Sequence, residues 1–91
     1  MYRIRVPIDG GHHDLYLTKM VSAKCLRNLV LKRMSTATDA EYIVLYQVHR
    51  TLGLVAELPH MAHWYVSRNY YAKHPELGDV TITVTQIDTL N

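Results

Sequence analysis

Cysteine, phenylalanine and long apolar runs are scarce or missing in this 91-residue sequence. The single cysteine, Cys25, excludes an internal disulfide framework and CxxC-type metal sites, which fits a reducing compartment. No apolar run approaches the roughly 20 residues that span a bilayer, and the opening MYRIRVPIDGG lacks the apolar core of a secretory signal. We therefore expect a cytoplasmic protein without a transmembrane segment.

Motifs for catalysis and cofactor binding are also missing. The serines stand outside any GxSxG context, and no glycine-rich phosphate loop with a following lysine occurs. The histidines include His12-His13 and His60-x-x-His63, but Pro59 and the lack of a third ligand argue against zinc. A chain this short has one small core and little room for a deep cleft. We expect no enzyme activity, no cofactor and no metal site.

The sequence does contain an uneven charge distribution. Hydrophobic residues make up 48% and charged residues 20% of the chain, as in an ordinary folded domain. Residues 1–34 hold seven Lys/Arg and two acids, a balance of +5, whereas residues 35–91 hold three Lys/Arg and six acids, a balance of −3. Such asymmetry favours an acidic partner through long-range attraction.

The first third of the chain predicts two strands joined by a turn. Tyr2 to Asp9, YRIRVPID, alternates apolar side chains with Arg3 and Arg5, as a half-buried strand does. Asp9 to Asp14, DGGHHD, supplies the glycines of a hairpin turn, and Leu15 to Val21 predicts the second strand. The outward positions of that second strand are Tyr16, Thr18 and Met20.

A helix is predicted next. Ser22 is a suitable N-cap because its hydroxyl can accept a backbone N–H, and Cys25 is expected to pack within the helix pattern. The apolar stripe of the predicted helix consists of Leu26, Leu29, Val30 and Met34. The side expected to face solvent consists of Lys24, Arg27, Asn28 and Lys32.

Three further segments complete the predicted fold. Glu41 to His49, EYIVLYQVH, is rich in β-branched and aromatic residues and predicts a central strand, and Thr51 to Leu58 predicts a short one. His60 to Leu77 fits neither period, and Val80 to Ile87 alternates cleanly as a strand. The order ββαββ-(α)-β is that of an α+β ubiquitin-like β-grasp, with a mixed sheet of about five strands on one main helix. We expect a single domain over residues 1–91, alone or as a module of a longer protein. A ferredoxin-like βαββαβ order would need a helix where the chain has a glycine turn.

Several segments resemble Ras-association and Ras-binding ubiquitin-like domains. IRVPIDGG, AKCLRNLVLKRM and EYIVLYQVH are similar to the first hairpin, the helix and the third strand of that family. AELPHMAHWYVSRNYYAK resembles a segment in which Leu-Pro precedes Tyr-Tyr and a lysine, as in some Rap exchange factors. The resemblance implies a non-catalytic module whose second strand pairs with the switch strand of a GTP-loaded Ras-family GTPase. The GTPase would then recruit the module to membranes. From the basic surface and the outward strand positions we expect the partner-binding residues to be Arg3, Arg5, Tyr16, Thr18, Lys19, Lys24, Arg27, Lys32 and Arg33. Among these, the resemblance itself implies Arg5, Lys19 and either Lys32 or Arg33.

Other partners stay open on the same residues. Lys19 is the only basic residue on the predicted second strand, whereas family members that bind tightly often carry more than one. WYVSRNYYAK also resembles a doublecortin-type domain, which implies tubulin as the acidic partner. A further alternative is a structural subdomain whose partner is the rest of a larger protein. A candidate stacking platform for single-stranded nucleic acid comprises Trp64, Tyr65, Tyr70 and Tyr71 beside Arg68 and Lys73. A chain without phenylalanine needs some of these rings for its core, which argues against the platform.

Overall fold

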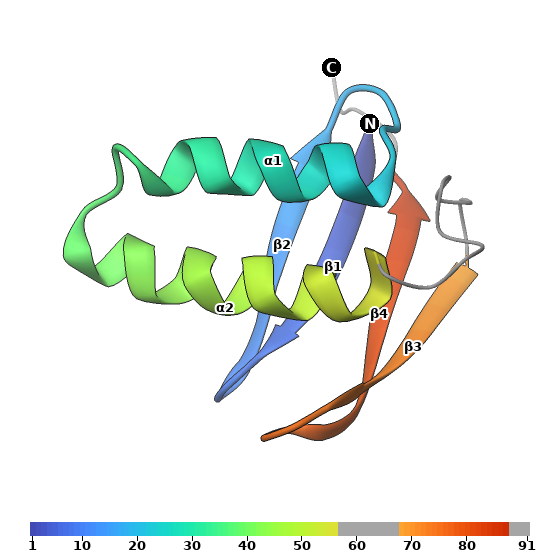
Figure 1. Ribbon diagram of the computed structural model, residues 1–91. Coiled ribbons are helices and arrows are strands. Elements are labelled where there is room, and N and C mark those ends of the chain that lie inside the picture. Colours follow the sequence, from blue (N-terminus) through green and yellow to red (C-terminus); the bar gives the residue numbers. More distant parts are fainter. Residues whose placement is uncertain (57–67, 88–91) are drawn as a thin grey trace.

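The computed structural model describes residues 1–56 and 68–87 of the chain. These residues form β1 (Tyr2–Ile8), β2 (Gly11–Leu17), α1 (Ala23–Met34), α2 (Asp39–Ala56), β3 (Arg68–His74) and β4 (Gly78–Gln86). The two helices lie side by side across one face of a single sheet (Figure 1). The chain is therefore an α+β protein, as predicted. No helix within the described residues is long and apolar enough to cross a bilayer.

The sheet has the strand order β2-β1-β4-β3, and each neighbouring pair is antiparallel. The hairpins β1–β2 and β3–β4 join along β1 and β4, where Ile4 lies opposite Val84. Ile4, Val84 and Ile82 are fully buried under the helices, whereas alternate residues of the same strands lie on the uncovered face. The period of two in these strands was correctly predicted, because it follows from the pleat alone.

Both helices bury one apolar stripe. In α1 the hydroxyl of Ser22 accepts the N–H of Cys25 at 3.1 Å, which confirms the predicted N-cap. The buried residues of α1 are Ala23, Leu26, Val30 and Met34. Those of α2 include Leu45, Val48, Leu52 and Val55, at the same spacing of three and four. Leu29 and Cys25, predicted to pack, are exposed, because they lie more than a quarter turn from the stripe.

The central strand predicted over Glu41 to His49 is wrong, because the segment lies inside α2. Thr51–Ala56, the described part of another predicted strand, also belongs to α2. Thr38 accepts the N–H of Glu41 at 3.3 Å through its Oγ1, and Asp39 and Glu41 place negative charge in the first turn of α2. Both features favour a helix start. Packing of the stripe on the sheet thus outweighs the β preference of its residues.

The mixed five-stranded sheet of the predicted β-grasp is not confirmed. The described residues form four strands, and β4 runs antiparallel to β1. One of those strands, β3, falls in the part of the chain that fitted neither period, and the alternation of buried Tyr70 with exposed Tyr71 places it in the sheet. Residues 57–67, which carry the rest of that prediction, lie outside the described residues.

The first hairpin is tighter than predicted. Asp9 and Gly10 alone form the turn, and β2 begins at Gly11 and ends at Leu17. Gly10 has a φ of 85°, a conformation that glycine adopts without steric cost, so a two-residue loop suffices. The prediction that Leu15 to Val21 forms the strand is therefore wrong by four residues at each end. Lys19, assigned to that strand, instead lies between β2 and α1.

Candidate functional site

The outer edge of the sheet at β2 is the first feature of the candidate site. Among the described strands β2 pairs with β1 alone. Because the loop has two residues, Ile8 and Gly11 form the first hydrogen-bonded pair. Hydrogen-bonded and non-hydrogen-bonded pairs then alternate along the two strands. The backbone N–H and C=O groups of His12, Asp14 and Tyr16 therefore point away from β1. Another chain could extend the sheet by bonding to these groups.

Pro7 supports this assignment of inward and outward groups. It lies opposite His12, in a pair whose N–H groups do not cross between β1 and β2. Its missing donor thus falls on the β4 side, and the pairing of β1 with β4 ends two residues earlier, at Arg5 opposite Thr83. A proline is tolerated in a central strand only where no ladder bond is lost. The proline therefore leaves the β1–β2 ladder intact.

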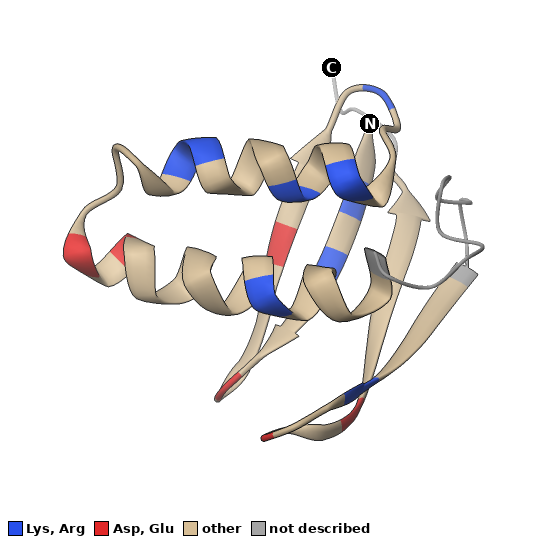
Figure 2. Cartoon of the chain, in the orientation of Figure 1, with Lys and Arg blue, Asp and Glu red and all other residues tan. Residues whose placement is uncertain are grey.

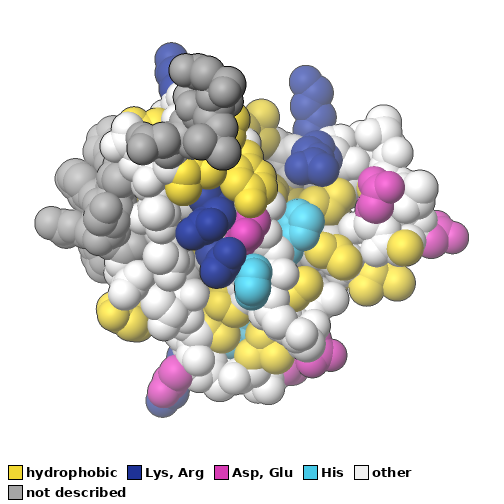
Figure 3. Space-filling view, turned by 180° about the vertical axis from the view of Figure 1, so that it is seen from behind, with side chains coloured by type: hydrophobic (Ala, Val, Ile, Leu, Met, Phe, Trp, Pro, Cys, Tyr) yellow, Lys and Arg dark blue, Asp and Glu magenta, His cyan; other side chains and the backbone are white. Residues whose placement is uncertain are grey.

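A hollow lies beside the β2 edge, under the helices. It measures about 300 Å³ and is lined by His13, Arg33, Ala40, Glu41, Val44 and Leu45. The end of α1 and the start of α2 extend past β2 (Figure 1), so these residues roof the space next to the strand. Seen from behind, hydrophobic side chains gather beyond the sheet on this side (Figure 3). A second hollow shares Arg33 and is lined by Leu29, Lys32, Arg33, Ser35 and Thr36.

The predicted partner-binding residues fall into separate groups. Figure 2 shows Lys and Arg mainly on α1 and β1. Arg3, Arg5 and Tyr16 lie on the sheet face away from the helices, and Tyr16 is 55% exposed. Thr18 and Lys19 are exposed after β2. On α1, the exposed members of this predicted set are Lys24 in the first turn and Lys32 and Arg33 in the last. Only Arg33 lines the hollow beside β2, with Lys32 next to it.

Arg5 carries a charge that the chain already neutralises. Its guanidinium donates to both carboxylate oxygens of Asp14, at 2.8 and 3.0 Å, across the β1–β2 pair. The hydrogen bond from Arg5 lowers the pKa of Asp14 below its usual value, and the same bond raises the pKa of Arg5. A partner would gain less from Arg5 than the sequence predicted, because the charge is partly compensated.

Arg27 was predicted on the exposed side of α1, and this placement is wrong. Its guanidinium lies against Gly53 of α2, where an added Cβ would be 2.9 Å from Nη2. Its Nε is buried without a hydrogen-bond partner among the described residues. Burial, and next the charge of Arg27, lower the pKa of His49. Arg27 therefore packs between the helices, and Gly53 provides the space for it.

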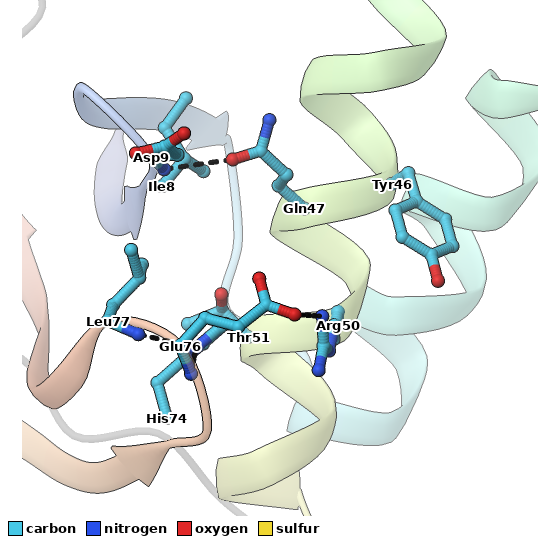
Figure 4. A pocket seen from close by; sticks show the side chains of 9 residues that line it. All are labelled: Ile8, Asp9, Tyr46, Gln47, Arg50, Thr51, His74, Glu76 and Leu77. Carbon is cyan, nitrogen blue, oxygen red and sulfur yellow. Dashed lines mark hydrogen bonds and ion pairs between the residues drawn. The ribbon is translucent and has the colours of Figure 1, made fainter.

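A different pocket, of about 180 Å³, lies where α2 meets the two hairpin turns (Figure 4). Its polar groups bond to one another. Arg50 donates to Glu76 at 2.8 Å, and Gln47 accepts the N–H of Asp9 at 2.8 Å. His74 accepts the N–H groups of Glu76 and Leu77 through Nδ1, at 3.0 and 3.1 Å. Because these groups are hydrogen-bonded within the chain, we interpret the residues around the pocket as structural contacts that hold α2 to both turns.

The arrangement of His, Cys, Asp and Glu in the described residues includes no cluster of three that could hold a metal ion. His60 and His63 lie outside the described residues, as do Trp64 and Tyr65 of the candidate stacking platform. Tyr70, assigned to the same platform, is buried in the core. Tyr71 is 68% exposed on the open face of the sheet.

Comparison of the chain with protein-family models, curated proteins and solved structures finds no match. The likeness to Ras-association domains thus rests on the sequence segments. One of them, EYIVLYQVH, forms a helix here in place of a third strand.

Proposed function

We propose that the chain is a non-catalytic protein-interaction module that binds an extended segment of an acidic partner by strand addition at β2. The outer edge of β2 is the observation that carries this proposal, because among the described strands β2 pairs with β1 alone. Arg33 of α1 lines the hollow beside this edge, and Lys32 lies next to Arg33. An edge strand offers backbone donors and acceptors that another chain can bond, while neighbouring side chains select the partner.

The outward backbone groups of β2 would supply part of the binding energy. His12, Asp14 and Tyr16 each have one outward N–H and one outward C=O. A typical hydrogen bond contributes about 0.5–1.5 kcal/mol net, so full pairing gives several kcal/mol before the cost of ordering the partner. The exposed charges of Lys19, Lys32 and Arg33 would act mainly by accelerating encounter with an acidic surface.

A GTP-loaded Ras-family GTPase is the partner that we propose first, because the resemblance to Ras-association domains implies it. Strand addition to the switch strand needs a free β2 edge, and basic residues near that edge suit an acidic GTPase surface. In this proposal the module is cytoplasmic and reaches membranes through the GTPase. Tubulin or another acidic protein is the alternative partner for the same edge.

An NMR titration tests this proposal. Ras and Rap, each loaded with a GTP analogue or with GDP, are added to the ¹⁵N-labelled chain. We expect the amide signals of His12, Asp14 and Tyr16 to shift with the GTP form and much less with the GDP form. Equal shifts in both nucleotide states, or shifts that avoid β2, would contradict the GTPase proposal.

A matched pair of variants separates the backbone from the side chain. Tyr16→Pro removes an outward N–H and places a ring at the edge, whereas Tyr16→Thr removes the aromatic ring and keeps the N–H. Since proline is accepted at a strand edge, both variants should fold. We expect Tyr16→Pro to weaken binding about tenfold or more and Tyr16→Thr to change it about twofold or less. Equal effects would show that the edge is not used.

Nucleic-acid binding is a second candidate, favoured by the open face of the sheet. Tyr16 and Tyr71 are exposed there, and Arg3 lies opposite Tyr16. Exposed aromatic rings beside basic groups suit stacking of single-stranded bases. Addition of oligo(dT) or oligo(U) with Tyr71→Ala as the variant tests it. Loss of oligonucleotide binding in both Tyr71→Ala and Tyr16→Thr, each of which removes an exposed ring and keeps the backbone N–H, would favour this function over strand addition.

A further inference from the structure

We propose that the hollow under the α1–α2 hairpin receives the alternate side chains of the strand that pairs with β2. The module would then select a segment of a partner protein with an apolar residue at every second position. This inference rests on the proposed strand addition, and it adds the sequence pattern that the added strand must have.

The register of β2 decides which side chains of an added strand meet the hollow. Leu15 is buried toward the helices, and His13 on the same face lines the hollow. Side chains of a paired strand point to the same two faces in alternation. The residues of the partner opposite His13 and Leu15 would therefore point under the helices. Those opposite Asp14 and Tyr16 would point to the uncovered face.

The position of the hollow matches the position of a fifth strand. Neighbouring strands lie about 4.8 Å apart, and a helix with its side chains is about 10 Å wide. Helix ends that extend past β2 thus roof the place of the next strand (Figure 1). The residues of the helices that line the hollow are the apolar Ala40, Val44 and Leu45 and the charged Arg33 and Glu41. Apolar side chains of moderate size fit this lining.

A second copy of this chain is a poor occupant. Antiparallel pairing of two β2 edges about a two-fold axis would form one continuous sheet with all four helices on the same face. The α1–α2 hairpin of each copy extends past its own β2, so the two hairpins would meet over the joined edges. An added strand that carries no helices of its own avoids this collision. The occupant is therefore an extended segment of another protein.

Short capped peptides test the pattern independently of any GTPase. One peptide alternates valine with threonine between two glutamates, and a control of the same composition places the valines in one block and the threonines in another. The chain carries ¹⁵N amides and ¹³C valine methyl groups. We expect the alternating peptide to shift the amides of His12 and Tyr16 together with the methyl groups of Val44. The block peptide should bind about tenfold more weakly or worse.

Two tryptophan variants of α2 form the matched pair. Ala40→Trp fills the hollow from an exposed position, and Ile43→Trp adds the same ring at a side chain that is 62% exposed and does not line the hollow. Neither position belongs to the buried core, so both variants should fold. We expect Ala40→Trp to weaken the alternating peptide about tenfold and Ile43→Trp about twofold or less.

The outcomes separate this inference from the proposed function. If the amide signals of β2 shift while those of the Val44 methyl groups do not, or if the two tryptophan variants weaken peptide binding equally, the added strand does not place side chains in the hollow. Strand addition at β2 would still hold. Binding of neither peptide at β2 would also overturn the selection of alternating apolar residues. The GTPase titration then judges strand addition by itself, because it needs no particular peptide sequence.

Discussion

The effect of Gly53→Ala on stability is expected to depend on Arg27. In α2, alanine stabilises a helix by about 1 kcal/mol over glycine. In this chain the new Cβ would lie 2.9 Å from Nη2, 3.0 Å from Cζ and 3.3 Å from Nε of Arg27. Carbon contacts are most favourable near 3.5–4.0 Å, so the guanidinium of Arg27, the far end of a flexible side chain, must shift to admit the Cβ. Overpacking costs about 1–3 kcal/mol, and a flexible group takes the lower end of that range. In the native background this cost offsets the gain in helix propensity, so we expect Gly53→Ala to change the free energy of unfolding by less than about 1 kcal/mol.

Removal of the arginine side chain should restore the full gain in helix propensity. In an Arg27→Ala background the space above Gly53 is open, and Gly53→Ala should raise the free energy of unfolding by about 1 kcal/mol. The coupling between the two sites is then about 1 kcal/mol. Urea unfolding of the four proteins measures it through their midpoints and slopes.

A control double-mutant cycle uses Lys24→Ala, at an exposed position of α1, the helix that contains Arg27. Its effect should add to that of Gly53→Ala within about 0.5 kcal/mol. If Gly53→Ala stabilises the native chain as much as the Arg27→Ala variant, Arg27 does not lie over α2. Arg27 would then be available to a partner, as the sequence predicted.

Three further predictions concern charge. Asp14→Asn removes the ion pair with Arg5. Because the pKa of Asp14 is lowered in the folded state, the stability from this pair is present above about pH 4 and disappears as the pH falls through the folded-state pKa. In urea unfolding the variant should therefore be less stable than the native chain at neutral pH, and it should lose less stability than the native chain on acidification. The pKa of His49 is also lowered in the folded state, so on acidification the unfolded chain binds a proton before the folded chain does. The free energy of unfolding should therefore decline below about pH 6.5. If it declines equally with pH in His49→Gln and in the native chain, this expectation is refuted. Lys32→Glu should weaken GTPase binding about tenfold through slower association while the free energy of unfolding changes by less than about 1 kcal/mol; loss of folding would place Lys32 in the core instead.

Local patterns in the sequence determined β1, α1 and β4. The alternation around Ile4 and Ile82 and the stripe that begins after Ser22 depend on side-chain periods of two and 3.6, which neighbouring residues reveal. The basic character of the first 34 residues was likewise readable, including Lys32 and Arg33 near the eventual site. These features need no knowledge of what the segment packs against.

Tertiary structure decided α2, β3 and the site. The residues of EYIVLYQVH suit a strand, yet the segment is helical and buries Leu45 and Val48 on the sheet. Burial of such a side chain contributes about 1.5–3 kcal/mol, which outweighs β propensities that differ by at most about 1 kcal/mol per residue. The hollow joins His13, Arg33 and Val44, which are far apart in the sequence and meet because the helices extend past β2. Which strand is an edge depends on the order of all strands in the sheet, and no local period contains that order.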